Sequence, residues 1–185
     1  MSLVAKSTAE DFERPKNGLV NAVCVFVEDI GTHKGSYKGE ETMRHQCVIC
    51  FELAEKMTKG DYAGKPFMLS KFYTVSLGKK ANLSKDLESW FGKELPSETR
   101  VNGFDLKTLI GRHCTLNIIT KTKQDGSEYA TIGGIMPTQG IAEKLIPYNT
   151  VPPTWIDTLR KKSMEMTGEL DMSQLPPRDD EGLPF

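Results

Sequence analysis

Aromatic and basic side chains are interleaved along the middle of the chain, and together these two types could hold a strand of nucleic acid. Each base stacked on an aromatic ring contributes about 1 to 3 kcal/mol, while Lys and Arg follow the phosphates. Neither contact reads base sequence, so binding would be general and would weaken steeply with added salt. The candidate residues are Lys34, Tyr37, Lys38, Arg44, Lys71, Phe72, Tyr73, Lys79, Lys80, Lys121, Lys123 and Tyr129.

A structural role is the alternative for each of these residues. Small β domains need Phe and Tyr in the core, and solvated lysines are ordinary on a protein surface. Strand alternation separates the two roles for the neighbours Phe72 and Tyr73. If the odd-numbered residues of 67–77 face the core, Phe72 is an exposed stacking platform and Tyr73 is structural. A β-bulge would reverse this assignment.

Motifs of catalysis and metal binding are missing from the sequence. It contains neither a Walker A loop nor a G-x-S-x-G sequence, and the histidines at 33, 45 and 113 are scattered. Cys47 and Cys50 have C-x-x-C spacing, but on one regular strand they would point to opposite faces and could not share zinc. We therefore expect no enzymatic activity, no cofactor and no metal, and we interpret the four cysteines as buried, reduced thiols.

The charge of the chain is distributed unevenly. The net charge is −1, but residues 33–123 hold 16 Lys and Arg against 10 Asp and Glu. Residues 165–185 hold 6 acidic residues and a single Arg. A basic body with an acidic end indicates a site for a polyanion and a separate segment with its own partner. The alternative, for the basic segment or the acidic segment taken alone, is that the charges are unevenly distributed but only solvated, without a binding role.

Hydrophobic periodicity predicts five strands and one main helix. The segment 31–41, which contains three glycines, is expected to be a mobile loop carrying Lys34, Tyr37 and Lys38. The strands are expected at 18–30, 42–53, 67–77, 112–122 and 127–137, with a turn at Asp125-Gly126 joining the last two. The helix is expected at 82–92, capped by Asn82 or Ser84 and ended by Gly92, with a shorter helical stretch at 104–111.

The order of three strands, a helix and two strands predicts a mainly β fold, the five-stranded OB barrel with a helix between strands 3 and 4. The predicted divisions are a flexible N-terminal arm at 1–16, the nucleic-acid-binding domain at 17–138, a C-terminal extension at 139–170 and a disordered acidic tail at 171–185. In the extension, Thr154 is expected to cap a short helix that bears Trp155, Ile156 and Leu159. This helix is expected to pack against the barrel.

The last seven residues combine acids with apolar side chains in a pattern suited to docking on other proteins. Phe185 could enter an apolar pocket while the upstream carboxylates meet a basic rim. The predicted partner-binding residues are Asp179, Asp180, Glu181, Leu183, Pro184 and Phe185. They resemble the C-terminal tip of bacterial single-stranded DNA-binding proteins, although Gly182 is an insertion relative to the usual tip. The resemblance implies recruitment of replication or recombination proteins.

The body of the chain is similar to the OB-fold single-stranded DNA-binding proteins of bacteriophages. The similarity lies in KFYTVSLGKKANLSKDLESWFGKEL and FDLKTLIGRHCTLNI, within residues 71–118. It implies a protein that coats and protects single-stranded DNA during replication, recombination and repair. The alternative is a replication adaptor whose tail binds partners while the barrel binds a ligand other than DNA.

The location expected from the sequence is the cytoplasm, that of the bacterial host if a phage encodes the protein. Residues 1–16 lack the apolar stretch of a secretory signal, and no apolar run approaches the ~20 residues that span a membrane. The sequence predicts no oligomeric state.

Overall fold

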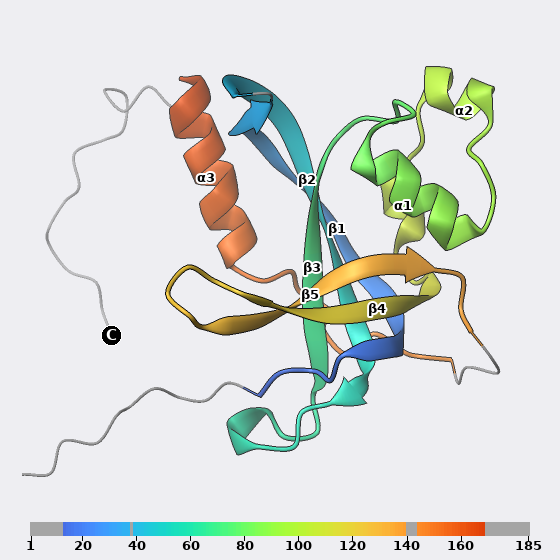
Figure 1. Ribbon diagram of the computed structural model, residues 1–185, viewed down its shortest axis with the longest axis vertical. Coiled ribbons are helices and arrows are strands. Elements are labelled where there is room, and N and C mark those ends of the chain that lie inside the picture. Colours follow the sequence, from blue (N-terminus) through green and yellow to red (C-terminus); the bar gives the residue numbers. More distant parts are fainter. Residues whose placement is uncertain (1–12, 38, 140–143, 169–185) are drawn as a thin grey trace, which may run out of the picture.

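The computed structural model describes residues 13–37, 39–139 and 144–168, and these form a mainly β structure with helices on both sides of the sheet (Figure 1). The strands are β1 (Gly18–Tyr37), β2 (Glu40–Lys56), β3 (Pro66–Thr74), β4 (His113–Thr122) and β5 (Glu128–Met136). The helices are α1 (Asn82–Phe91), α2 (Ser97–Asn102) and α3 (Trp155–Thr167), with short 3-10 helices at Gly60–Tyr62 and Leu106–Leu109.

The five strands form one antiparallel sheet in the order β3-β2-β1-β4-β5. The first half of β1 is the centre of the sheet, because Ala22 pairs with both Leu53 of β2 and Cys114 of β4. The edge strands β3 and β5 approach until their Cα atoms lie within 8 Å, but no hydrogen-bonded ladder joins them within the described residues. The predicted element order, with α1 between β3 and β4, is confirmed.

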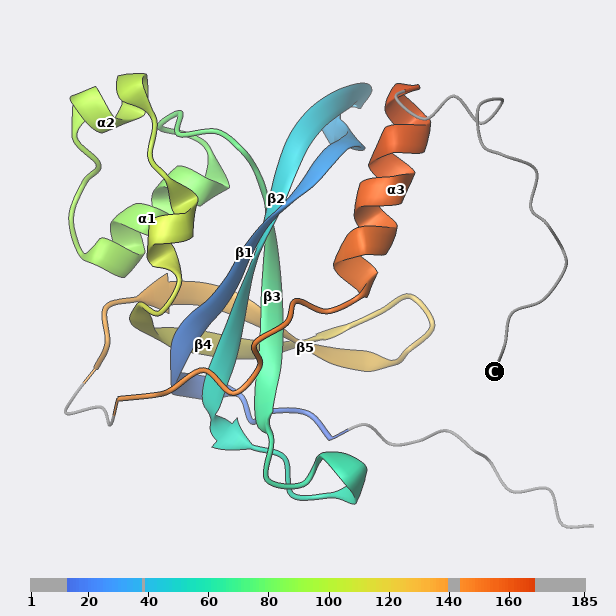
Figure 2. The same ribbon diagram turned by 180° about the vertical axis from the view of Figure 1, so that it is seen from behind.

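Both faces of the β1–β2 hairpin are buried, each by a different helix. On one face, Phe51 and its neighbours pack against Leu87 and Trp90 of α1. On the other face, Val48 and its neighbours pack against Ile156 of α3, and Figures 1 and 2 show α1 and α3 on opposite sides of the hairpin. Two covered faces explain why residues 18–30 are apolar in both parities.

The predicted loop at 31–41 is wrong, because β1 continues to Tyr37 and β2 begins at Glu40. Cross-strand pairs such as His33 with Arg44 extend the hairpin almost to its turn. The glycines do not end the strand, because pairing with β2 satisfies the hydrogen bonds of the backbone. Gly31 lies at a shift in the strand register, where an irregular backbone conformation is accommodated.

The helix between β3 and β4 occupies the predicted place and ends at Gly92 as expected. The predicted cap is wrong, because Ala81 is the N-cap residue and makes no side-chain cap hydrogen bond. Ser84 is instead buried and accepts a hydrogen bond of 2.6 Å from Arg100. Arg100 belongs to α2, a short helix that we did not predict, whereas the turn at Asp125-Gly126 and the last two strands are confirmed.

The C-terminal extension packs against the sheet, as predicted, through α3 and the segment before it. Thr154 is the N-cap residue, but it makes no side-chain cap hydrogen bond. Upstream of α3, the buried carboxylate of Glu52 accepts hydrogen bonds of 2.6 Å from the backbone of Tyr148 and 2.7 Å from that of Asn149. The extension is therefore attached at two places, by the buried face of its helix and by the Glu52 carboxylate.

The last four residues of the predicted flexible arm have defined contacts. Residues 13–16 lie against the domain, where Glu13 accepts a hydrogen bond of 2.7 Å from the backbone of Thr58 and Arg14 pairs with Glu128 at 3.0 Å. Residues 1–12 and the whole of the predicted acidic tail, 171–185, lie outside the described residues. Among the helices that are described, none is long and apolar enough to cross a membrane.

Candidate nucleic-acid interface

A groove of about 880 Å³ lies between β2 and the loop that follows β3. Its walls come from Met43–Gln46, from Phe72–Ser76, and from Gly78 and Lys80–Asn82. Arg44, His45 and Lys80 are among these residues, whereas none of the described lining residues is Asp or Glu. A concave surface with cationic groups and without carboxylates attracts a polyanion.

Phe72 is one of the residues that line this groove, and its side chain is half-exposed. The regular β2–β3 ladder pairs Phe72 with Val48 and has no bulge there. The side chain of Phe72 is 51% exposed, whereas that of its neighbour Tyr73 is 3% exposed. Strand alternation therefore gives Phe72 the exposed position, as predicted for odd-numbered residues facing the core.

Tyr73 has a structural role instead. Its phenol donates a hydrogen bond of 2.7 Å to Asp86 of α1, which ties β3 to that helix. Burial and the neighbouring Asp86 carboxylate raise the pKa of Tyr73 far above its usual value. Lys71 lies on the same face and pairs with Asp86 at 2.7 Å, so its charge is balanced, and it does not line the groove.

The cations of the groove come from two elements. Arg44 lies on β2, where its Nε donates a hydrogen bond of 3.1 Å to Thr42. Lys79 and Lys80 are exposed in the turn before α1, and Lys80 lines the groove. His45 lies beside Arg44 with its ring nitrogen 2.9 Å from the carboxylate of Asp29. Of the predicted residues, Arg44, Phe72, Tyr73 and Lys80 thus line the same groove.

The predicted residues of the β4–β5 hairpin form a separate cluster. Lys121 pairs with Tyr129 across the two strands, and the Lys123 ammonium lies 5.8 Å from the centre of the Tyr129 ring. Lys123 and Tyr129 line a hollow of about 580 Å³ beside Met68 and Leu69 of β3. None of these hairpin residues lines the groove at Phe72.

The remaining predicted residues lie at or near the tip of the β1–β2 hairpin. Lys34 is exposed on β1 and lies 3.6 Å from the carboxylate of Glu41. The backbone of Tyr37 pairs with Glu40 at the end of the same strand, and Lys38 is outside the described residues. The predicted tip residues, from Asp179 to Phe185, also lie outside the described residues.

Trp155 is the site residue that the sequence did not identify. Its indole ring lies 5.8 Å from that of Phe72, centre to centre, at an interplanar angle of 51°. We predicted only that Trp155 lies on a short helix that packs against the barrel, because helical periodicity does not show which strand residue a helix meets. The two rings come from positions 83 residues apart in the sequence.

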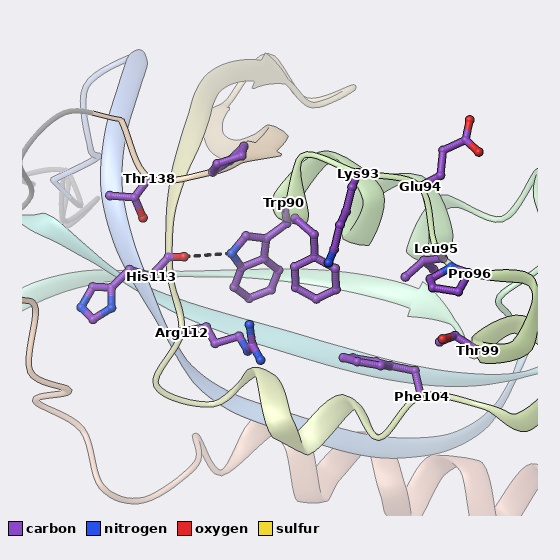
Figure 3. A pocket seen from close by; sticks show the side chains of 12 residues that line it. Trp90, Lys93, Glu94, Leu95, Pro96, Thr99, Phe104, Arg112, His113 and Thr138 are labelled. Atoms are coloured by element: carbon purple, nitrogen blue, oxygen red, sulfur yellow. Dashed lines mark hydrogen bonds between the residues drawn. The ribbon is translucent and has the colours of Figure 1, made fainter.

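A second hollow, of about 630 Å³, lies beside α1 and is shown in Figure 3. Phe91 and Phe104 form part of its wall, and Lys93 and Glu94 lie on its rim. The Arg112 guanidinium lies 5.6 Å from the centre of the Phe91 ring. This hollow contains none of the predicted nucleic-acid residues, and its rim carries charges of both signs.

The four cysteines are buried free thiols, as predicted. Cys47 belongs to the core beneath α1 and Cys50 to the core beneath α3, so their side chains point to opposite faces of β2. Burial raises the pKa of Cys47 to about 11 and that of Cys114 to about 12, which keeps both thiols protonated at neutral pH. No cluster of three His, Cys, Asp or Glu suited to a metal occurs within the described part of the chain.

Comparison with known proteins assigns no family to the chain. No protein-family model matches the chain, and a search of curated proteins found no significant match. The groove at Phe72 therefore has to be interpreted from its own residues.

Proposed function

We propose that this protein binds single-stranded DNA without sequence preference, with the groove at Phe72 as the centre of the site. The observation that carries the proposal is a large, half-exposed aromatic ring in a concave surface that has cations and no described carboxylate. Covering the exposed Phe72 ring with a base would remove apolar surface from water, which is favourable. A base stacked on the ring and phosphates near Arg44 and Lys80 would use both features.

The sheet supports an OB-type barrel for this role. In the order β3-β2-β1-β4-β5, the two edge strands approach each other, and α1 enters between β3 and β4. This connectivity supports the five-stranded OB fold as the proposed architecture, and OB folds bind oligonucleotides on the face of strands 2 and 3. The groove at Phe72 is built from β2 and β3.

The biological role that we propose is a non-catalytic coat that protects single-stranded DNA during replication, recombination or repair. The residues 179–185 would recruit other replication or recombination proteins. Their combination of three acids with Leu183, Pro184 and Phe185 supports this part of the proposal. If the protein is phage-encoded, it would act in the cytoplasm of the host bacterium.

Fluorescence anisotropy of labelled oligo-dT and of a matched duplex, each at low and high salt, tests this function. We expect preferential binding of the single strand and a steep loss of affinity with salt. Removing the stacking ring in Phe72→Ala should weaken binding about 5- to 150-fold, which corresponds to about 1 to 3 kcal/mol. Arg44→Ala and Lys80→Ala should each weaken binding and reduce its salt dependence.

Lys93→Ala is the matched control, because it removes an exposed lysine from the other hollow and should leave affinity unchanged. Absence of binding to either nucleic acid would refute the proposed role of the groove. That outcome would favour the alternative of a replication adaptor with a ligand other than DNA, for which the aromatic hollow beside α1 is a second candidate surface.

A further inference from the structure

The exposed indole of Trp155 is not explained by the attachment of α3. The helix docks on the sheet through Ile156, which is fully buried, and through Ser163, which is nearly so. Trp155 is 37% exposed, whereas Trp90, which is part of the core, is 4% exposed. The Trp155 ring meets Phe72 at the edge of the helix, so two rings from α3 and β3 form one aromatic surface that is open to solvent.

Specific contacts hold α3 at a defined position against β1. Ser163 accepts a hydrogen bond of 2.6 Å from the backbone of Thr32, and Gly31 leaves room for that side chain. One turn earlier, Arg160 pairs with Glu28 at 2.6 Å and donates a hydrogen bond of 2.8 Å to the backbone oxygen of Asp29. Because the helix is held in place, Trp155 is presented without a large entropic cost on binding a ligand.

The flank of α3 that begins with Trp155 also carries a cation. Lys162 follows Trp155 by seven residues, about two helical turns, and therefore lies on the same flank. It is exposed and makes no ion pair with any described residue, unlike Arg160 on the docking face. Lys161, its neighbour, is rotated by about 100° around the helix axis and points elsewhere.

We propose that α3 is the second half of the single-stranded DNA site, in which Trp155 stacks a base next to the one on Phe72 and Lys162 contacts a phosphate. This inference rests on the proposed function. It makes the C-terminal extension a part of the binding surface, so the bound strand leaves the groove between β2 and β3 and continues along the flank of the helix.

Intrinsic fluorescence provides a direct test, because the chain has only two tryptophans and Trp90 is buried. Stacking of a base on Trp155 should quench the emission when unlabelled oligo-dT is added, and Trp155→Phe should abolish the quenching. By anisotropy of labelled oligo-dT, Trp155→Ala should weaken binding about 5- to 150-fold, whereas Trp155→Phe, which keeps a ring, should recover most of the affinity.

Matched controls separate stacking from general damage to the helix. Tyr148→Ala removes an aromatic side chain that is 56% exposed on the same extension and should not change affinity. Lys162→Ala should lower affinity and the salt dependence, while Lys161→Ala should have a smaller effect on both. Circular dichroism and urea unfolding of each variant check that α3 remains folded.

The outcomes distinguish this inference from the function on which it rests. If the wild-type protein does not bind oligo-dT by anisotropy, the proposed function fails. If it binds and Phe72→Ala weakens the binding, but oligo-dT quenches no tryptophan emission and Trp155→Ala binds like the wild type, α3 is not part of the site. Equal losses in Trp155→Ala and Trp155→Phe, without quenching in the wild type, would also overturn the stacking role.

Discussion

The position of α3 depends on a close approach at Gly31, and replacing this glycine by alanine is the sharpest test of that packing. Gly31 has a φ of +83°, and a Cβ atom built there would lie 2.2 Å from the Oγ atom and 2.7 Å from the Cβ atom of Ser163. Neither distance is tolerable between non-bonded atoms, so Gly31→Ala must displace α3 or distort the strand.

Three contributions determine the expected loss of stability. An alanine in the left-handed region costs about 1 to 2 kcal/mol. Overpacking against Ser163 adds about 1 to 3 kcal/mol, and loss of the hydrogen bond from Thr32 to Ser163 adds about 1 kcal/mol. We therefore expect Gly31→Ala to lower the free energy of unfolding by about 3 to 6 kcal/mol.

Gly126→Ala is the matched control for this substitution. Gly126 has nearly the same φ, +84°, but no atom lies within 4 Å of the position that its Cβ would take. Its replacement should cost only the backbone contribution, about 1 to 2 kcal/mol. Urea unfolding followed by far-ultraviolet circular dichroism measures both variants, and the difference between them isolates the packing of α3.

A double-mutant cycle completes the test. Ser163→Gly removes both atoms that the new methyl group would meet, so Gly31→Ala should cost less in the Ser163→Gly background than in the wild type. Equal losses for Gly31→Ala and Gly126→Ala, together with additive effects in the cycle, would refute the tight contact between α3 and β1.

Three further predictions concern buried and half-buried polar groups. Glu52→Gln should lower the free energy of unfolding by about 2 kcal/mol, because an amide N–H₂ group replaces one carboxylate oxygen and then faces a backbone donor. An unchanged urea midpoint would contradict this expectation. Arg100→Ala should lower the free energy of unfolding by about 2 kcal/mol, because Glu88 loses its ion-pair partner. A double variant with Glu88→Ala that is as stable as Arg100→Ala would support the pairing by the same assay. Stability should fall above pH 9, because unfolded thiols lose protons near 9.0 while the raised pKa of Cys47, about 11, keeps the native thiol protonated. The free energy of unfolding should fall by up to about 1.4 kcal/mol per pH unit for this thiol. The fall should be smaller in Cys47→Ala. A urea midpoint that stays constant from pH 8 to 10.5 would argue against this role of Cys47.

Local features of the sequence were sufficient to predict much of the secondary structure. The period of α1, its end at Gly92 and the Asp125-Gly126 turn depend on neighbouring residues, and all three are confirmed. The loop predicted at 31–41 failed because its glycines were interpreted locally, whereas pairing with β2 satisfies the backbone there. The cap of α1 failed because Ser84 has a tertiary partner, Arg100, that no local pattern indicates.

The features of the candidate site also divide into those that the sequence predicts and those that only the tertiary structure determines. The sequence alone determines the basic character of the segments around Phe72 and Tyr73. Once the parity of β3 is known, it also determines that Phe72 is exposed and Tyr73 is buried. Only the tertiary structure determines that Lys71 is paired with Asp86, that the residues of the β4–β5 hairpin form a cluster of their own, and that Trp155 meets Phe72. Alternation along a strand is set by covalent geometry and can be predicted from one segment. The meeting of α3 with β3 depends on how distant segments bury their apolar faces together, and no single segment contains that information.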